Sequence, residues 1–402
     1  MATDTTEPHQ PYRLLDDDYG SHAPAFDGHD DYKPSWSRRL FAWHSKFVDQ
    51  FALDVMEKAF LFGESLDWDA AVPGGVDGLR ELYGGDSLLD EPDAYYVEPA
   101  DPNRFRLTKL DDLPDGGERF QLKFDSTYQT WDDTFCDEFG CHSSNEKVTA
   151  RIWRHHDLSR PTAVCLHCWC GGYLRLEERV FAAKRLYEEG YNVVVVTLPF
   201  HGERTPTDAI FSGQFFPSPD LRRTNEAFGQ AVSDVRLLTR WLKEEGFDGP
   251  MGLLGISLGG YITSLMISLF DTYDFAAPII APASFADILW WHGTERKARA
   301  MFEDAGVDRE MLRAIWAVHC PLSYELKIPA ERVLIVAGAG DAVVRPAQSL
   351  SLWSHWGEPE LRWFAGSHLG HFRWLAGSAV GSDMLDFMNP VVDWLGELDF
   401  GR

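Results

Sequence analysis

Residues Met251 to Phe270 read MGLLGISLGGYITSLMISLF, the most apolar long stretch of the chain. A membrane-spanning helix needs about 20 apolar residues, so the length alone would suit one. Four glycines and three serines interrupt the stretch, however. It divides better into a buried strand, a sharp turn at GISLG (255–259) and a buried helix. The pattern therefore predicts a strand–turn–helix unit and no transmembrane segment.

The serine at this turn, Ser257, is a candidate nucleophile. In the pattern G-x-S-x-G the serine lies on a strained turn at the carboxyl edge of a sheet, with its hydroxyl raised towards solvent. The glycines leave room where the strand and helix backbones approach each other. The N-terminus of the following helix favours a developing negative charge. The alternative is a serine that only caps the helix, but the apolar segments on both sides of Ser257 favour the nucleophile.

A serine hydroxyl needs a base and a group that orients that base. The expected chain order at such a turn is serine, acid, histidine. Asp341 ends the apolar run ERVLIVAGAGD (331–341), which predicts a strand followed by an acid. Two histidines follow the next predicted strand, in WFAGSHLGHFRW. We favour His368, which comes directly after the strand and its Gly-Ser turn, and His371 is the alternative.

An oxyanion hole needs two backbone N–H groups. One should come from Leu258, directly after the nucleophile. The other should come from the loop after the first parallel strand, HCWCGG (167–172). We assign it to Trp169, with Cys168 as the alternative. Ordinary packing is the competing interpretation of this loop.

The chain divides into three regions. Residues 1–34 are acidic and rich in Asp, His, Gly and Pro, which predicts a disordered tail. Residues 35–105 form an extension with one helix and then loops and turns. Residues 106–402 form one α/β domain.

Within this domain, alternating patterns predict half-exposed antiparallel strands over 117–124 and 147–153. Strands then alternate with helices, which predicts a mainly parallel sheet covered by helices on both faces. The predicted later strands cover 162–167, 191–200, 251–257, 275–282, 331–341 and 359–367, and the first two long helices cover 177–190 and 225–246.

The helix predicted over 35–66 carries apolar residues at helical spacing. They are Trp36, Leu40, Trp43, Phe47, Phe51, Val55 and Phe60. An apolar stripe must be covered, and packing on the main domain is the simplest way. A homodimer interface and a cover over the mouth of the site are the alternatives.

The strand, the turn and the acid and histidine that follow resemble the alpha/beta-hydrolase superfamily over roughly residues 145–398. GISLGGY and GSHLG match its nucleophile and histidine patterns. HCWCGG is similar to its His-Gly-x-x-Gly oxyanion loop, with Cys168 where glycine is usual. The N-terminal helix, LPFHGERTP and GISLGGYI resemble the branch called alpha/beta-hydrolase domain-containing protein 18. Membership would imply hydrolysis of acyl esters or phospholipids.

An insertion at about 283–329 separates the strand at 275–282 from the acid strand and reads as two or three short helices. In the superfamily that this chain resembles, such an insertion is usually a lid. Its Trp290 and Trp291 are candidate substrate-binding residues and suggest a substrate with an apolar part. The alternative is that these tryptophans pack the insertion against the sheet.

These residues predict a serine hydrolase that cleaves a carboxylic ester through an acyl-enzyme. Ser257 attacks, His368 takes the proton and Asp341 orients His368. An acyltransferase, a thioesterase or a peptidase would use the same triad. The alternative that is not an enzyme is a non-catalytic binding module on this fold. No phosphate-binding glycine fingerprint follows the first strand, so we expect no cofactor, and the triad needs no metal.

Composition constrains partners and compartment. Asp and Glu number 63 against 37 Lys and Arg, a net charge of −26, which would repel nucleic acid and anionic membranes. We therefore expect a small-molecule or lipid-like ester as substrate. The first residues lack the basic and apolar regions of a secretory signal, and CLHCWC (165–170) lacks the second cysteine pair of a typical zinc site. The sequence predicts a reducing, cytoplasmic location.

Overall fold

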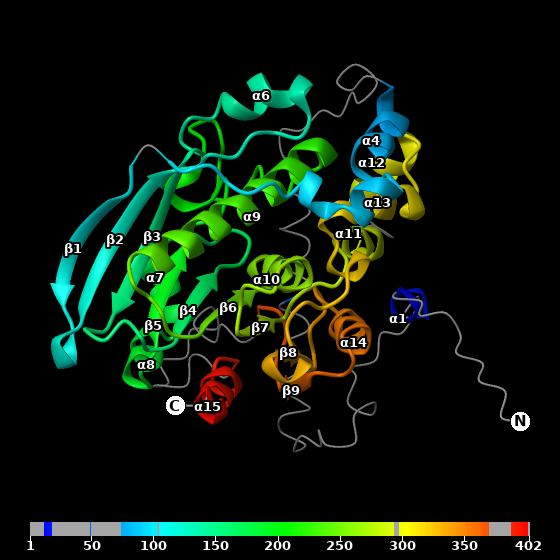
Figure 1. Ribbon diagram of the computed structural model, residues 1–402. Helices are drawn as coiled ribbons and strands as arrows, with labels where there is room; N and C mark the ends of the chain where they lie inside the picture. Colours follow the sequence, from blue (N-terminus) through cyan, green and yellow to red (C-terminus); the bar gives the residue numbers. More distant parts are fainter. Residues whose placement is uncertain are drawn as a thin grey trace, which may run out of the picture.

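Nine strands of the described chain form a single mixed sheet in a computed structural model (Figure 1). The structure describes residues 12–17, 49, 74–102, 104–292, 297–369 and 387–400. The strands are β1 (Arg106–Asp112), β2 (Glu118–Asp125), β3 (Lys147–Arg154), β4 (Thr162–Leu166), β5 (Asn192–Val196), β6 (Met251–Ile256), β7 (Phe275–Ile279), β8 (Leu334–Gly338) and β9 (Glu360–Phe364). Their spatial order is β1-β2-β3-β5-β4-β6-β7-β8-β9.

The first three strands are antiparallel, and β4 to β9 run parallel to one another. This confirms the predicted mainly parallel sheet with half-exposed strands at one edge. On β2, Phe120, Leu122 and Phe124 are buried while the residues between them are partly or fully exposed, which is the alternation of a strand with one covered face. The side chains of β4 to β8 are buried along the whole of each strand.

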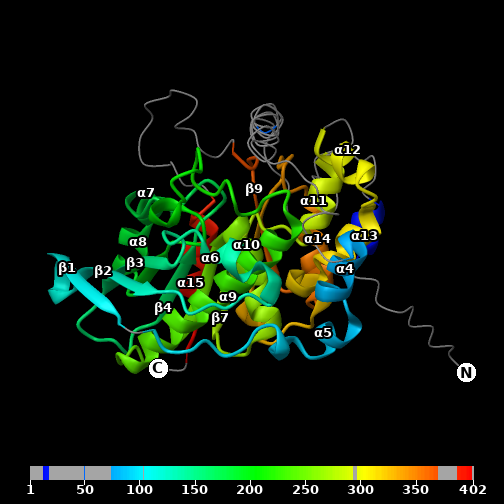
Figure 2. The same ribbon diagram turned by 90° about the horizontal axis from the view of Figure 1, so that it is seen from above.

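Helices cover both faces of the parallel strands (Figures 1 and 2). Val164 and Leu166 of β4 belong to the core shared with α9 (Leu221–Glu244) and α10 (Leu258–Leu269). Ala163 and Cys165, which alternate with them, belong to the core on the other face. The helices of that second core are α7 (Leu174–Val180), α8 (Ala183–Glu188) and α15 (Asn389–Glu397).

The helix predicted over 177–190 is two helices, α7 and α8. Ala182 separates them with φ of 49° and ψ of 41°, a left-handed conformation that ends the first helix. An amphipathic pattern continues across such a break because it records which residues are buried, not whether the backbone stays helical.

The N-terminal regions are more structured than the sequence indicates. Residues 13–17 form α1, within the predicted disordered tail, and the Leu15 side chain is buried. Between 67 and 105, where the sequence predicts loops and turns, α4 (Gly75–Tyr83) and α5 (Asp86–Asp90) are helical. The helix predicted over 35–66, and with it the dimer interface, lies outside the described residues except for residue 49.

The segment between β7 and β8 holds α11 (Phe285–His292), α12 (Lys297–Asp304) and α13 (Arg309–Ile315). Both ribbon views place these helices, together with α4, at the end of the molecule away from β1 (Figures 1 and 2). The remaining helices include α6 (Cys136–Gly140) and α14 (Pro346–His355). Among the described helices, none combines the length and the apolar character needed to span a membrane.

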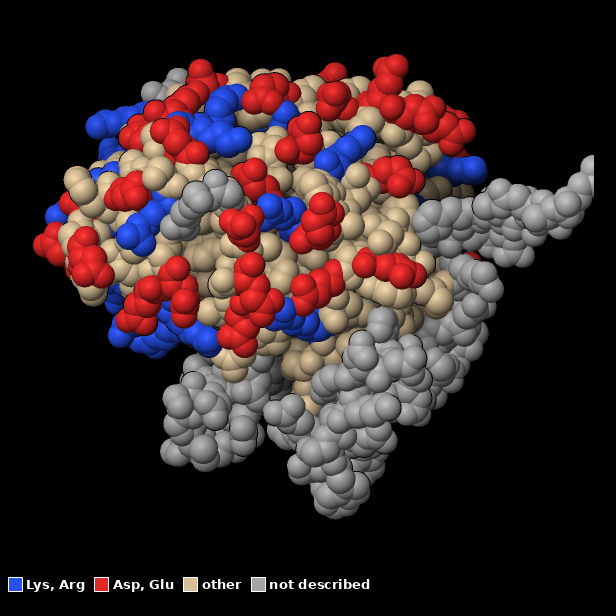
Figure 3. Space-filling view, turned by 60° about the horizontal axis from the view of Figure 1, so that its bottom comes forward, with Lys and Arg blue, Asp and Glu red and all other residues tan. Residues whose placement is uncertain are grey.

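The surface agrees with the acidic composition. Figure 3 shows Asp and Glu side chains spread across the face drawn there, with Lys and Arg side chains between them. Charges of both signs in such a mixture are typical of a solvated surface.

Candidate active site

Ser257 lies on the turn between β6 and α10. Its φ of 53° and ψ of −110° are rare for a residue with a side chain. A Cβ at Gly255 would lie 2.1 Å from the Gly259 carbonyl oxygen, and one at Gly259 would lie 1.9 Å from the Leu166 carbonyl oxygen. Both glycines are therefore required by close backbone contact. The turn leaves the Ser257 side chain partly exposed.

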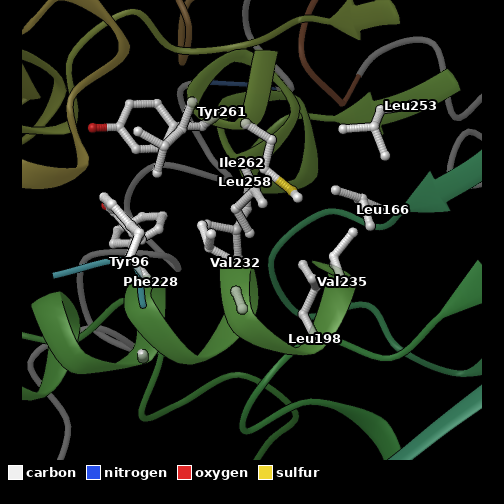
Figure 4. Close-up of a cluster of buried hydrophobic side chains, with 14 of the residues drawn as sticks. Tyr96, Leu166, Leu198, Phe228, Val232, Val235, Leu253, Leu258, Tyr261 and Ile262 are labelled. Atoms are coloured by element: carbon white, nitrogen blue, oxygen red, sulfur yellow. The ribbon is translucent and has the colours of Figure 1, made fainter. Parts of the chain in front are cut away.

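The helix after the serine is fixed by the core between α9 and α10. Figure 4 shows Leu258, Tyr261 and Ile262 of α10 facing Phe228 and Val232 of α9. Each of these five residues is at most 1% exposed. Close packing of this kind leaves little freedom for the helix to shift, and it holds the first turn of α10 against the end of β4.

Three predicted residues from distant parts of the chain form one hydrogen-bonded series. The Ser257 Oγ atom lies 2.9 Å from Nε2 of His368. Nδ1 of His368 lies 2.8 Å from Oδ2 of Asp341. Both His368 and Asp341 are 4% exposed. The alternative base, His371, lies outside the described residues.

The Asp341 carboxylate has a second set of partners. Its Oδ1 accepts the backbone N–H of Val343 at 2.9 Å and that of Val344 at 2.7 Å. Burial raises the pKa of Asp341, while the charge and hydrogen bond of His368 oppose that rise. Burial lowers the pKa of His368, but the charge and hydrogen bond of Asp341 outweigh it, so the pKa lies above its ordinary value. The Asp341 carboxylate thus favours the charged, imidazolium form of His368.

The loop from His167 to Gly172 follows β4 beside this turn. No acceptor among the described residues takes the backbone N–H of Leu258 or of Trp169. The Trp169 indole N–H donates to the carbonyl of Gly213 at 2.7 Å and so ties the loop to the segment after β5. Inside the loop, the Gly172 N–H donates to the buried carboxylate of Glu177 at 3.0 Å.

Cys168, which stands where the superfamily has glycine, keeps a negative φ. The positive φ values of this loop occur at Cys170, with 62°, and at Gly172, with 92°. The backbone therefore does not require glycine at position 168.

The insertion contacts the loop that carries Asp341. Ile288 of α11 packs against Val343 and Val344, and Nε2 of His292 lies 2.7 Å from the Val343 carbonyl oxygen. The two candidate substrate-binding residues are 8% and 9% exposed, and each lies under an arginine. The Arg299 guanidinium is 4.3 Å from the ring centre of Trp290, and that of Arg345 is 4.5 Å from Trp291.

One buried carboxylate at the site was not predicted. Asp49 is 0% exposed and accepts hydrogen bonds from the loops that carry Asp341 and His368. No feature of the sequence pattern indicates this contact. Asp49 lies two residues from both Phe47 and Phe51, about 200° around a helix from each of them. That position is on the polar face of the predicted helix, where an aspartate is usually solvated.

The chain is similar to a protein-family model and to known sequences. The family model described as alpha/beta hydrolase domain containing 18 matches residues 119–301. Two uncharacterised proteins of Mycobacterium tuberculosis are each 30% identical to the chain over 297 residues, which is 73% of this chain and 70% of the relative.

Solved structures with a similar fold include two acetyl xylan esterases. The one from a Thermoanaerobacterium species has a TM-score of 0.51 at 15% identity, and covers 79% of this chain and 98% of its own. The one from a Paenibacillus species has a TM-score of 0.52 at 14% identity, with 80% and 98% covered. At this identity the likeness shows the fold alone. The fold and the family model agree: the chain belongs to the alpha/beta-hydrolase superfamily.

Proposed function

We propose that the protein is a serine hydrolase that cleaves carboxylic esters. The observation that carries this proposal is the series Ser257–His368–Asp341, with contacts of 2.9 and 2.8 Å, on a strained turn that leaves the serine partly exposed. Two solved structures that share the fold are acetyl xylan esterases, so this fold accommodates ester hydrolysis.

The proposed reaction has two stages. Nε2 of His368 takes the proton of Ser257 as Oγ attacks the ester carbonyl, and Asp341 holds the imidazole by its Nδ1–H. The N–H groups of Leu258 and Trp169 stabilise the oxyanion. His368 then gives the proton to the leaving alcohol, and a water molecule, activated by the same imidazole, releases the acid from Ser257.

The insertion is proposed to be the cover of this site. Its α11 packs directly on the loop after Asp341, through Ile288 and His292. Trp290 and Trp291 belong to the same helix, and both side chains are largely buried. We propose that they shape the acyl-binding side of the site. An apolar wall of this kind suits an ester with an apolar acyl group.

The experiment is ester turnover with p-nitrophenyl acyl esters of increasing chain length. Ser257→Ala should lower kcat by at least about 1,000-fold while circular dichroism stays unchanged. Ser264→Ala is the matched control, because Ser264 is a buried serine of α10, the helix that follows Ser257, and its hydroxyl donates to the Gly260 carbonyl. It should retain turnover. If the folded Ser257→Ala variant hydrolyses the esters at the wild-type rate, the proposal is wrong.

A further inference from the structure

The carboxylate of Asp49 lies between two loops that follow neighbouring strands. Its Oδ1 accepts the Ser367 hydroxyl and the Leu369 N–H, and its Oδ2 accepts the N–H groups of His368 and Ala342. Each of these four contacts measures 2.9 Å. The side chain is fully buried, and a buried carboxylate keeps its charge only when donors of this kind satisfy it.

These bonds connect the two loops at the residues that matter for the proposed reaction. Ala342 directly follows Asp341, and His368 is itself a donor. Elsewhere the loops are joined by the Gly340 N–H, which donates to the Gly366 carbonyl at 2.8 Å. Asp49 is thus a further bridge between the two loops, and it holds the backbone N–H of the residue from which the imidazole extends.

Asp49 also adds negative charge beside the imidazole. The charged and titratable groups that face His368 from the described elements are Asp341, Asp49 and the Ser257 hydroxyl. A second carboxylate favours the imidazolium that forms when His368 accepts a proton. Its effect on the pKa of His368 is in the same direction as that of Asp341 and opposite to that of burial.

We propose that Asp49 is a positioning residue for the base, supplied by the N-terminal extension to the site in the hydrolase domain. It holds the His368 loop against the Asp341 loop, and its charge favours the imidazolium that forms when His368 takes the serine proton. This inference rests on the proposed function. It makes residues before the hydrolase domain part of the site, so the extension would contribute to turnover itself.

The test is Asp49→Asn in the full chain. The amide keeps the size of the side chain but loses the charge, and its NH2 group faces two of the four donors. We expect kcat to fall about 10- to 100-fold with KM changed less than about three-fold, because a small displacement of a catalytic group acts mainly on the chemical step. Without the nearby negative charge, the pKa of His368 falls. The acid limb of kcat/KM should therefore move to lower pH.

Glu226→Gln is the matched control. Glu226 is also fully buried and also accepts four hydrogen bonds, but its donors lie away from the series. They are the hydroxyls of Tyr83 and Tyr128 and the N–H groups of Trp131 and Asp132. A merely structural role for Asp49 predicts that both variants lose stability and keep the wild-type pH profile. The proposed positioning role predicts that only Asp49→Asn shifts the pH profile.

A folded Asp49→Asn variant with the wild-type kcat and acid limb overturns the inference and leaves the proposed function standing. Absence of ester turnover in the wild type defeats the proposed function instead. If Asp49→Asn does not fold, Ser367→Ala removes one donor and leaves the carboxylate in place. That variant should lower kcat about 3- to 10-fold with an unchanged acid limb, and an unchanged kcat there overturns the inference.

Discussion

Ser257 carries a backbone conformation that its neighbours enforce. Its N–H donates to the Ile279 carbonyl at 2.9 Å, and its own carbonyl accepts the Tyr261 N–H at 2.9 Å. Strained φ and ψ values persist where the surroundings fix them in this way, and such residues cluster at functional sites. The result is a hydroxyl that reaches His368 on a residue that stays partly exposed.

The pH dependence of turnover is set by one residue, His368. The base must be neutral to accept the serine proton, and the pKa of His368 is raised by Asp341 and Asp49 above its ordinary value of 6.5. As pH falls through the raised pKa, His368 becomes charged and kcat/KM should fall about ten-fold per unit. We therefore expect an acid limb with its midpoint above 6.5, measured with a neutral ester. A midpoint below that ordinary value would contradict the assignment of the base.

The candidate site residues that directly follow strands could be predicted from the sequence. Ser257, Asp341 and His368 each come after an apolar run, and parallel strands bring their carboxyl ends to one edge. Asp49 has no such signal, because its contacts with the Asp341 and His368 loops join residues far apart in the sequence, which a local pattern does not record. The pattern predicted a helix that must be covered but could not indicate what its polar face would contact.

Among the elements, the buried strands were the most predictable and β1 was missed. All seven residues of β1 are exposed, so its sequence lacks the alternation that burial imposes. It is held mainly by its ladder to β2 and by surface ion pairs such as Lys109 with Glu118. The helices α4 and α5 were missed for another reason: their glycine- and aspartate-rich flanks are typical of turns.

The close approach of α10 to β4 gives a prediction for an element. In Gly259→Ala, the new Cβ would lie 1.9 Å from the backbone oxygen of Leu166, which cannot move without shifting β4. We expect a loss of about 1–3 kcal/mol or more in the free energy of unfolding, measured with urea. Gly396→Ala in α15 is the control, since a Cβ at that position would have no neighbouring atom within 4 Å. It should be neutral or slightly stabilising, and equal effects of the two changes would contradict this account of the turn.

At the scale of the whole molecule, the proposed site joins three regions. The sheet supplies Ser257, Asp341 and His368, the insertion packs on the Asp341 loop through Ile288, and the N-terminal extension contributes Asp49. The mixed charged surface and the largely buried Trp290 and Trp291 of the insertion suit a site that takes an uncharged ester from solution.

The insertion gives a prediction about specificity. Trp291→Ala should change the ratio of kcat/KM for long and short acyl esters by about ten-fold or more, because it alters the volume of the proposed acyl pocket. Trp131→Ala is a control on another tryptophan, which packs beside Tyr95 and donates its indole N–H to the Leu82 carbonyl. An unchanged ratio in a folded Trp291→Ala variant would mean that Trp291 only packs α11 in place.

The most direct test of the central claim, an activated Ser257, is labelling with a fluorophosphonate followed by mass spectrometry of the modified peptide. We expect one phosphonylated residue, Ser257, with labelling lost in Ser257→Ala and retained in Ser264→Ala. We also expect slower labelling as pH falls through the raised pKa of His368, because the charged imidazole no longer accepts the serine proton. A folded wild-type protein that takes up no label, or takes it at another residue, would contradict this claim.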